Sequence, residues 1–386
     1  MKLGIVGGVL QGMEAAYLAR KAGYQTVVFD RWDEAPAFSL ADESIVLDVV
    51  KERKKAMRWL ADCDAVLPAN ENMETLRMLD DMFRETEVPM LFDLKAYEIS
   101  SSKVLSNQYM ERQGVPMPGS WPECGYPVVV KPSGQSGSAG VIKATCDADL
   151  QRGIQKVREL NDEVIVQEFV EGPNISIEVI GNGSEAAPMV LTEVVLDNSY
   201  DCRMVKCPVD GITDEVSRSF SSDAQKLAEG ISLRGIMDVE AIVKDGLPKV
   251  LEIDARIPSQ TPAAVYHATG INLVERLVEA LVEDKVDPNC PRHGAAIYEH
   301  IAVDGNVLRF CGEGAFSEVR RPRIEPGLFG SDEMITDFEA GKKCWRATII
   351  CSGATPENAW ARRTRCIHDL MEQNSLITVG EAEMHQ

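Results

Sequence analysis

An acidic hairpin near the middle of the chain constrains the fold more than any other stretch of the sequence. Residues 235–258, GIMDVEAIVKDGLPKVLEIDARIP, contain two runs of alternating apolar and polar residues, separated by Asp245 and Gly246. Alternation with a period of two predicts β-strands, and an Asp-Gly pair between two such runs predicts a tight hairpin turn. We therefore expect two adjacent antiparallel strands in this region.

Each strand of this hairpin carries two acidic residues two positions apart. They are Asp238 and Glu240 on the first strand, and Glu252 and Asp254 on the second. Residues i and i+2 of a strand face the same side, so four carboxylates are predicted on one face, with Arg256 beside them. Such crowding raises the pKa of each carboxyl group, and a divalent cation relieves the repulsion. Because Mg²⁺ takes carboxylate ligands together with substrate phosphates, we favour a metal site over a solvated acidic face.

A loop rich in Gly and Ser forms a second candidate site. In VVVKPSGQSGSAG, residues 128–140, Lys131 ends an apolar strand and the loop follows. Backbone N–H groups and hydroxyls of such a loop can bind phosphate oxygens, and the lysine adds a point charge. It is not a Walker A loop, because the lysine precedes the glycines and no helix follows. Taken alone, a mobile surface hairpin with an incidental lysine explains this stretch equally well.

The first residues of the chain suggest a dinucleotide-binding turn. LGIVGGVLQG, residues 3–12, reads as a strand that enters a glycine cluster, and a helical pattern follows. If Gly7 and Gly12 are the outer glycines of the fingerprint, Val9 stands where backbone must approach the pyrophosphate. Asp30 does end the next strand, where a ribose ligand belongs. We favour a tight turn without a dinucleotide and keep an NAD-dependent dehydrogenase as an alternative.

Strands and helices alternate over the first 95 residues, which predicts an α/β fold with a parallel sheet between helices. In this part the expected strands are 3–8, 25–30, 65–70 and 88–93, and the expected helices are 11–22 and 71–85. Further along, we expect a hairpin at 126–144, a helix at 147–160, two strands around a Gly-Pro turn at 164–180, and helices at 223–234, 271–284 and within 355–372.

The charge of the chain narrows the class of partner. The formal net charge is −21 over 386 residues, which disfavours nucleic acid, since its phosphates bind clustered Lys and Arg. No apolar run approaches the roughly 20 residues that span a bilayer, and the N-terminus lacks the pattern of a secretory signal. We expect a cytosolic protein with no nucleic-acid partner and no membrane partner.

In their order along the chain, these parts resemble the ATP-grasp carboxylate–amine ligases. Four segments, LPANENMETL, KPSGQSGSAGV, LTEVVLDNSYDCRMV and EIDARIPSQTP, resemble the branch of that family whose substrates are 3-methylornithine and L-lysine, in pyrrolysine biosynthesis. The resemblance implies an ATP-grasp fold with α+β lobes behind a Rossmann-like preceding domain. The implied domains are 1–95, an ATP-grasp core at 96–290 with a small lobe at about 118–180, and a C-terminal part at 291–386 that completes the large lobe.

The resemblance also implies ATP and Mg²⁺ as cofactors, and roles for residues that match the family's motifs. The ATP phosphates would be held by Lys103 and Lys131, and covered by Ser133, Ser136, Gly137 and Ser138. The adenine and ribose would be met by Glu168, Phe169, Val170, Glu171 and Asn174, the last of which replaces a glutamate of many relatives. Two Mg²⁺ would be ligated by Glu240, Glu252 and Asp254, with Asp238 as an auxiliary. Arg256 and Lys131 are the implied catalytic residues, of which Arg256 would stabilise an acyl phosphate.

The implied substrates both carry ammonium groups, so acidic side chains should surround them. The candidate substrate residues are Leu10, Gln11, Glu71, Glu178, Asp197, Asp201, Ser259 and Gln260. Each of the acidic candidates is also explained as a solvated carboxylate. Three alternatives stay open: a ligase for another acid or amine such as D-alanine, the dehydrogenase, and a non-catalytic nucleotide-binding protein. We further expect a homodimer.

Overall fold

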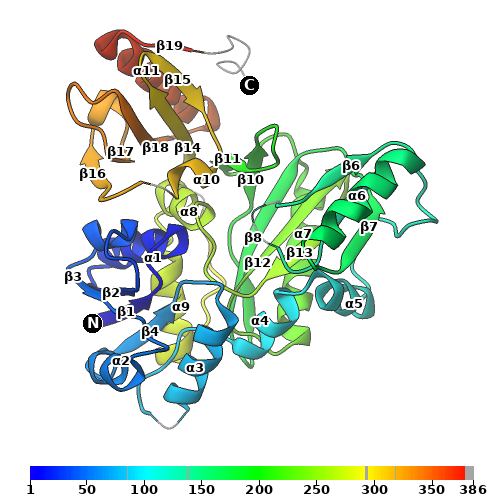
Figure 1. Ribbon diagram of the computed structural model, residues 1–386, viewed down its shortest axis with the longest axis horizontal. Helices are drawn as coiled ribbons and strands as arrows, with labels where there is room; N and C mark the ends of the chain where they lie inside the picture. The colour runs from blue at the N-terminus through cyan, green and yellow to red at the C-terminus, as the bar shows by residue number, and fades with distance from the viewer. Residues whose placement is uncertain (85, 136, 138, 292–293, 318, 379–386) are drawn as a thin grey trace.

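The computed structural model describes residues 1–84, 86–135, 137, 139–291, 294–317 and 319–378. These residues form an N-terminal parallel sheet, a small antiparallel sheet and a long mixed sheet (Figure 1). In the view of Figure 1 the N-terminal sheet lies at the lower left and the C-terminal strands lie above it. The small sheet and the first strands of the long sheet lie on the right.

The N-terminal sheet confirms the expected α/β pattern. Its strands pair in parallel in the order β3-β2-β1-β4. They are β1 (Lys2–Val6), β2 (Gln25–Asp30), β3 (Glu43–Val46) and β4 (Ala65–Pro68). The helices of this part are α1 (Leu10–Lys21), η1 (Pro36–Ser39), α2 (Arg53–Leu60) and α3 (Met73–Phe83). Residue 85, the expected last residue of the helix at 71–85, lies outside the described residues.

The strand expected at 88–93 is wrong. Only an isolated bridge joins Met90 to Val66 of β4, because the chain then turns into a helix. Asp93 caps that helix through the N–H of Ala96, and this ends the extended stretch. The two helices that follow are α4 (Leu94–Ser100) and α5 (Lys103–Gln113). Ser102 caps α5 through the N–H of Leu105, and Gly114 ends it in the left-handed conformation.

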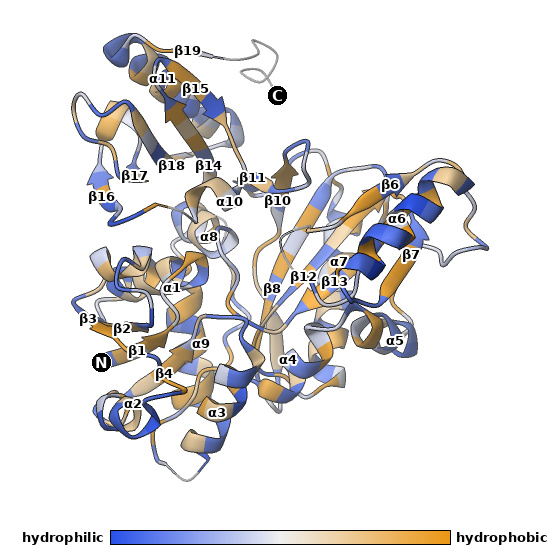
Figure 2. Cartoon of the chain, viewed as in Figure 1, coloured by the Kyte–Doolittle hydropathy of each residue, from blue (hydrophilic) through white to orange (hydrophobic). Residues whose placement is uncertain are grey.

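The small sheet contains the Gly/Ser loop. Its strands, in the antiparallel order β6-β5-β7, are β5 (Val128–Pro132), β6 (Ile142–Ala144) and β7 (Val164–Glu168). The expected hairpin at 126–144 is thereby confirmed. Helix α6 (Asp147–Glu159) packs on β5 through Gly153, where an added Cβ would lie 3.1 Å from Val130. Figure 2 shows α6 largely in hydrophilic colours, as expected for a helix that covers one face of a small sheet.

The long sheet runs from the acidic hairpin to the C-terminal strands. Its path is β13-β12-β8-β10-β11-β14-β18-β17-β16, with β9, β15 and β19 paired to its members. The strands up to the hairpin are β8 (Asn174–Asn182), β9 (Ala186–Pro188), β10 (Thr192–Leu196), β11 (Cys202–Cys207), β12 (Arg234–Lys244) and β13 (Leu247–Asp254). The C-terminal strands are β14 (Ala295–Asp304), β15 (Val307–Phe310), β16 (Arg323–Pro326), β17 (Glu333–Thr336), β18 (Cys344–Gly353) and β19 (Ile377–Thr378).

The helices around the long sheet are α7 (Asp214–Gly230), α8 (Thr261–Thr269), α9 (Leu273–Val282), α10 (Glu313–Phe316), η2 (Leu328–Gly330) and α11 (Pro356–Asn374). Helix α7 begins earlier than the expected start at 223, since Thr213 caps it through the N–H of Val216. The strands expected around the Gly-Pro turn exist but belong to different sheets: β7 to the small sheet and β8 to the long one. The segment between them therefore connects the two sheets.

Helix α8 occupies a central place in the fold. It contacts α1 of the N-terminal part and the strands β11, β14 and β18 of the long sheet. Figure 1 shows it between the N-terminal sheet and the C-terminal strands. Its side chains Ala263, Ala264 and Val265 are fully buried in the largest hydrophobic cluster. Within the described residues, we find no helix long and apolar enough to cross a membrane.

Candidate active site

The acidic hairpin forms as expected, with its two strands side by side. Asp238 on β12 lies opposite Asp254 on β13, and Glu240 lies opposite Glu252. The register shifts directly after Glu240, which marks a β-bulge beside the carboxylates. Four carboxylates therefore share one face of a two-stranded segment, as the sequence predicted.

Strand β8 adds two polar residues to this face. Glu178 lies opposite Asp238, and Ser176 lies opposite Glu240. The Ser176 hydroxyl donates to Asp238, and the Glu178 side chain is fully buried. Within the described part of the chain, neither carboxylate oxygen of Glu178 has a hydrogen-bond partner of good geometry. A buried carboxylate without a partner is costly, so this position favours a bound cationic group.

Three cationic side chains border the carboxylate face. Lys103, at the start of α5, places Nζ 3.3 Å from Oε2 of Glu252. Arg256 places Nη2 3.0 Å from Oδ2 of Asp254. Lys131, on β5, is 7% exposed. Burial lowers its pKa, while the charges of Glu252 and Glu240 act to raise it. The small sheet and the long sheet thus both contribute to one charged site.

The pKa values reflect burial and like-charge crowding. Burial, followed by the charge of Glu178, raises the pKa of Asp238 to about 8. Burial and Glu252 raise the pKa of Glu240 well above its ordinary value. Burial also acts to raise the pKa of Glu252, but Lys103 and Lys131 outweigh it and lower that pKa. Such opposed shifts in one cluster are typical of functional sites.

Lys103 also holds the Gly/Ser loop. Its Nζ donates to the carbonyl of Gln135 at 2.7 Å, and its backbone N–H donates to the carbonyl of Ser133 at 3.0 Å. The Ser133 hydroxyl accepts from the N–H of Val104 at 3.2 Å. Gly137 has a φ of 59°, which a glycine adopts without strain. The other two predicted loop residues, Ser136 and Ser138, lie outside the described residues.

The segment between the two sheets carries the predicted adenine and ribose residues. Glu168 ends β7, and its side chain is bound by Lys244 and Lys249. Lys143 lies 3.7 Å above the ring centre of Phe169 and pairs with Glu171 at 3.2 Å. The two remaining predicted residues of this group are Val170, which is buried, and Asn174, which begins β8.

The glycine turn at the N-terminus does not fit a dinucleotide. Asp30 accepts from the N–H of Gly8 at 2.7 Å and from the N–H of Trp32 at 2.8 Å. The carboxylate expected to meet a ribose is therefore bound to the chain's own backbone. A Cβ on Gly12 would lie 2.1 Å from the carbonyl of Gly7, so that glycine is needed for close packing within the turn.

The turn does reach the charged site. Leu10 begins α1, and Gln11 donates from Nε2 to Oε1 of Glu71 at 2.8 Å. The same Glu71 oxygen lies 2.9 Å from Nη2 of Arg256. Gln11 and Glu71 are thus placed beside the carboxylate face from the N-terminal sheet, whereas Leu10 packs against the largest hydrophobic cluster.

Ser259 and Gln260 lie at the start of α8 and share one partner. Oγ of Ser259 and Nε2 of Gln260 each donate to Oε2 of Glu313 at 2.7 Å. Gln260 has a φ of 78°, a strained conformation for a residue with a side chain. Its Oε1 accepts from the Cys202 thiol at 3.0 Å. These contacts fix both predicted substrate residues in place.

Asp197 and Asp201 are bound to backbone rather than to the carboxylate face. Asp197 accepts from the N–H of Ser199 and from the N–H of Asp201, so it shapes the turn between β10 and β11. Asp201 accepts from the N–H of Gly314 at 3.0 Å. The structure therefore brings Glu71 and Glu178 to the site more closely than these two aspartates.

Sequence reasoning missed three polar residues near α8. Glu313 comes from the four-residue helix α10 and carries no local pattern. Glu14 is 3% exposed and accepts from the N–H of Ala263 at 2.6 Å, in the first turn of α8. Thr261, the first residue of α8, has a buried hydroxyl that acts on the pKa of Glu178. The sequence offered one signal for these residues: Glu14 is an acidic residue among the apolar side chains of α1.

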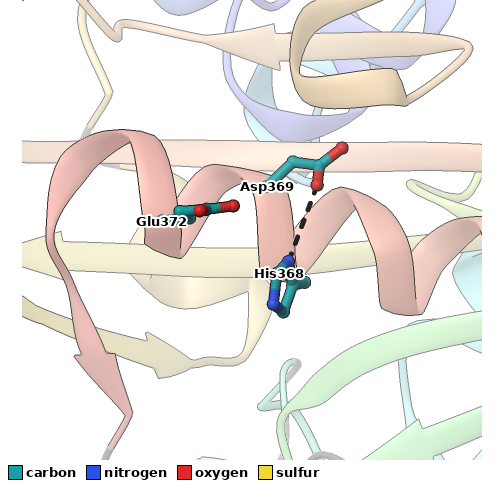
Figure 3. A group of neighbouring side chains, drawn as sticks. All are labelled: His368, Asp369 and Glu372. Atoms are coloured by element: carbon teal, nitrogen blue, oxygen red, sulfur yellow. Dashed lines mark ion pairs between the residues drawn. The ribbon is translucent and has the colours of Figure 1, made fainter.

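A separate group of possible metal ligands lies on α11. Among the described residues, His368, Asp369 and Glu372 are the group whose ligand atoms lie within 4.8 Å of one another. Nδ1 of His368 is 3.6 Å from Oδ1 of Asp369 (Figure 3). His368 and Glu372 are exposed, and the helix belongs to the C-terminal strands rather than to the acidic hairpin. We assign this group no role.

Sequence comparison identifies relatives over nearly the whole chain. An ATP-grasp domain model matches residues 100–260. The 3-methyl-D-ornithine–L-lysine ligase of Methanosarcina barkeri (strain Fusaro) is 40% identical over 371 residues, which are 96% of this chain and 97% of that protein. The enzyme of the same name from Methanosarcina acetivorans is 40% identical over 330 residues, covering 84% of this chain and 87% of that protein.

Structural comparison supports the fold. The crystal structure of an ADP complex of N5-carboxyaminoimidazole ribonucleotide synthetase superposes with a TM-score of 0.72. The sequence identity is 20%, and the match covers 96% of this chain and 97% of the other. At this identity the likeness concerns the fold alone. It confirms the ATP-grasp architecture expected from the order of the motifs.

Proposed function

Because the chain belongs to the ATP-grasp enzymes, in the family of 3-methyl-D-ornithine–L-lysine ligases, we propose that it joins these two amino acids by an amide bond with hydrolysis of ATP to ADP and phosphate. The acid is the carboxyl group of 3-methyl-D-ornithine, and the amine is the ε-amino group of L-lysine. The product would serve pyrrolysine biosynthesis. The chain is therefore an ATP-dependent, amide-forming ligase.

One observation carries this proposal most strongly. The paired carboxylates Asp238–Asp254 and Glu240–Glu252 face the cationic side chains of Lys103 and Arg256 in one partly buried site. A ligase of this kind must hold a metal–nucleotide complex and two substrates with ammonium groups. Carboxylates and cationic side chains together serve both needs.

The donor atoms at the hairpin fit Mg²⁺. They are carboxylate oxygens, which this hard cation prefers. Burial, and after it the charges of neighbouring carboxylates, raise the pKa values of Asp238 and Glu240, and a bound cation would relieve that repulsion. We propose that Glu240, Glu252 and Asp254 ligate the metal, with Asp238 as an auxiliary. A bound Mg²⁺ supplies Lewis-acid stabilisation of charge on phosphoryl oxygens.

The ATP residues follow the same proposal. Lys103 and Lys131 would hold the phosphates, and the loop with Ser133, Ser136, Gly137 and Ser138 would cover them. Glu168, Phe169 and Val170 would lie along the adenine, mostly through backbone groups. Glu171 or Asn174 would meet the ribose. In support, Lys103 binds both the loop carbonyl of Gln135 and Glu252, so the loop and the metal ligands share one lysine.

The reaction proceeds in two steps. The donor carboxylate attacks the γ-phosphorus of ATP, the bond to the β,γ-bridging oxygen breaks, and ADP and an acyl phosphate form. The lysine amine, in its neutral form, then attacks the acyl carbon and expels inorganic phosphate. Lys131 and Arg256 stabilise the negative charge on the oxygens of the transferring group, which is the main source of catalysis in such reactions.

The substrate pockets are proposed around the carboxylates that face the site. Glu178 and Glu71 would bind ammonium groups of the two amino acids. Glu313, which accepts from Ser259 and Gln260, would belong to the same pockets. Leu10 and Gln11 would contact one substrate from the N-terminal turn. Asp197 and Asp201 stay proposed substrate residues, although both carboxylates accept from backbone N–H groups. We keep a cytosolic location and a homodimer as further proposals.

Release of ADP tests this function. Purified protein with Mg-ATP is expected to release ADP only when 3-methyl-D-ornithine, or D-ornithine in its place, is present together with L-lysine. D-Alanine in the place of either amino acid is the control. Equal release with D-alanine would contradict the substrate assignment, and no release with any diamino acid would contradict the proposal as a whole.

A further inference from the structure

Glu168 is held by the acidic hairpin from the other sheet. Its Oε1 accepts from Nζ of Lys244 at 2.8 Å, and its Oε2 accepts from Nζ of Lys249. Oε2 also accepts from the N–H of Gly119 at 3.0 Å, and the side chain is 17% exposed. One carboxylate of the small sheet is thus bound by two lysines of the long sheet.

Backbone contacts reinforce this connection. The N–H of Val243 on β12 donates to the carbonyl of Pro173 at 3.0 Å. A Cβ on Gly172 would lie 2.0 Å from the carbonyl of Val243, so only glycine allows the two backbones to approach so closely. The segment 169–173, which joins the two sheets, therefore lies directly against the end of the hairpin.

The same hairpin carries the proposed metal ligands. Lys244 follows Glu240 on β12, and Lys249 precedes Glu252 on β13. Strands rise about 3.3 Å per residue, so the lysines lie roughly 10–13 Å along the strands from the carboxylates. One rigid element thus contacts the segment that would meet the adenine and the carboxylates that would meet the phosphates.

We propose that Lys244 and Lys249 are positioning residues for the nucleotide: by holding Glu168, they fix the segment 169–173 at a set distance from the carboxylates of the same hairpin. This inference rests on the proposed function, in which that segment lies along the adenine. It predicts that the two lysines control nucleotide affinity while touching no substrate.

The charges around Glu168 predict that removal of one lysine weakens its position less than removal of both. The two lysines and the Gly119 N–H lower the pKa of Glu168 to about 2, although burial acts in the opposite direction. Removal of one lysine leaves an ion pair with the other. Removal of both leaves a partly buried carboxylate with the Gly119 N–H as its remaining donor, and we expect the segment to move.

Calorimetric titration of the full chain with Mg-ADP tests the proposal without any amino-acid substrate. Lys244→Met and Lys249→Met are each expected to weaken binding about threefold, and the double variant roughly tenfold. Lys249→Arg should restore binding to near the wild-type level. Lys156→Met, on the exposed face of α6, is the matched control and should bind like the wild type.

A ligand without a base separates positioning from general loss of structure. Mg-tripolyphosphate should bind the double variant as it binds the wild type, because the carboxylates and phosphate lysines are unchanged. In the ligase reaction, the double variant should raise KM for ATP with kcat nearly constant. Equal loss of affinity for Mg-ADP and Mg-tripolyphosphate, or no loss for either, would overturn the positioning role.

Failure of the proposed function gives a different result. A wild-type protein that binds Mg-ADP but ligates no amino-acid pair would contradict the ligase assignment, while the variant series still decides the role of the lysines. A wild-type protein that binds no Mg-ADP would overturn both proposals together.

Discussion

Glu71 and Arg256 form an ion pair, with Oε1 of the glutamate 2.9 Å from Nη2 of the arginine. Glu71 follows the last strand of the N-terminal sheet, and Arg256 follows the acidic hairpin. Gln11, in the first turn of α1, donates to the same glutamate oxygen. The glycine turn that resembles a cofactor fingerprint therefore acts on the charged site through Glu71.

Replacement of Glu71 should therefore impair the reaction. Glu71→Gln removes the charge that orients Arg256, and we expect kcat/KM to fall about 10- to 100-fold, since small misplacements of a catalytic group are costly. Glu98→Gln breaks an exposed ion pair with Arg77 nearby and serves as the control. If both variants show wild-type kcat/KM, Glu71 does not position Arg256.

Replacement of a proposed metal ligand should abolish turnover without unfolding the chain. For Glu252→Gln we expect a loss in kcat on the order of 100-fold or more, because Mg²⁺ binding and phosphoryl transfer both need this carboxylate. Glu215→Gln, on the exposed side of α7, is the control. Activity is measured by ADP release and folding by circular dichroism. Full activity of a folded Glu252→Gln protein would contradict the metal site.

The buried lysine of the small sheet should not tolerate even a conservative change. Lys131 is 7% exposed, so a larger and differently shaped guanidinium does not fit in its place. We expect both Lys131→Met and Lys131→Arg to weaken Mg-ADP binding about tenfold or more. Lys226→Met on α7 is the control. Wild-type affinity in Lys131→Met would remove this lysine from the nucleotide site.

Glu14 should make stability depend on pH. Burial raises its pKa from 4.5 to about 8, against the N–H groups of Ala263 and Gln260, so the folded state binds the proton more tightly than the unfolded state. Its stabilising contribution is complete below pH 4.5 and is lost as the pH rises through about 8. Relative to Glu14→Gln, the wild type should lose up to about 1.4 kcal/mol of unfolding free energy per pH unit in that range. Urea unfolding between pH 5 and pH 8 measures this difference, and parallel curves would contradict it.

The hairpin could be predicted because its signals are local. Alternation over 238–254 and the Asp-Gly turn predict both strands, and the structure confirms them. The register shift after Glu240, which places Glu252 opposite Glu240, could not be predicted from these signals. The first helix and the last were predicted on the same grounds. The strand at 88–93 failed because Asp93 starts a helix there, and a cap of this kind competes with an extended apolar run.

The rest of the site depends on sheet order, which the sequence does not display. Glu178 faces Asp238 only because β8 lies next to β12 in the long sheet, although four other elements separate the two strands along the chain. Glu313 reaches Ser259 and Gln260 from α10, far along the chain. Such contacts arise from tertiary packing and could not be read from residue spacing.

Mass spectrometry of the reaction product tests the central claim most directly. The protein is incubated with Mg-ATP, L-lysine and 3-methyl-D-ornithine whose carboxyl oxygens carry ¹⁸O. We predict one new amide with the mass of the two amino acids less one water, and one ¹⁸O atom in the released phosphate, since the donor oxygen leaves with the phosphoryl group. Absence of this amide, or an amide formed without ¹⁸O in the phosphate, would contradict the ligase mechanism.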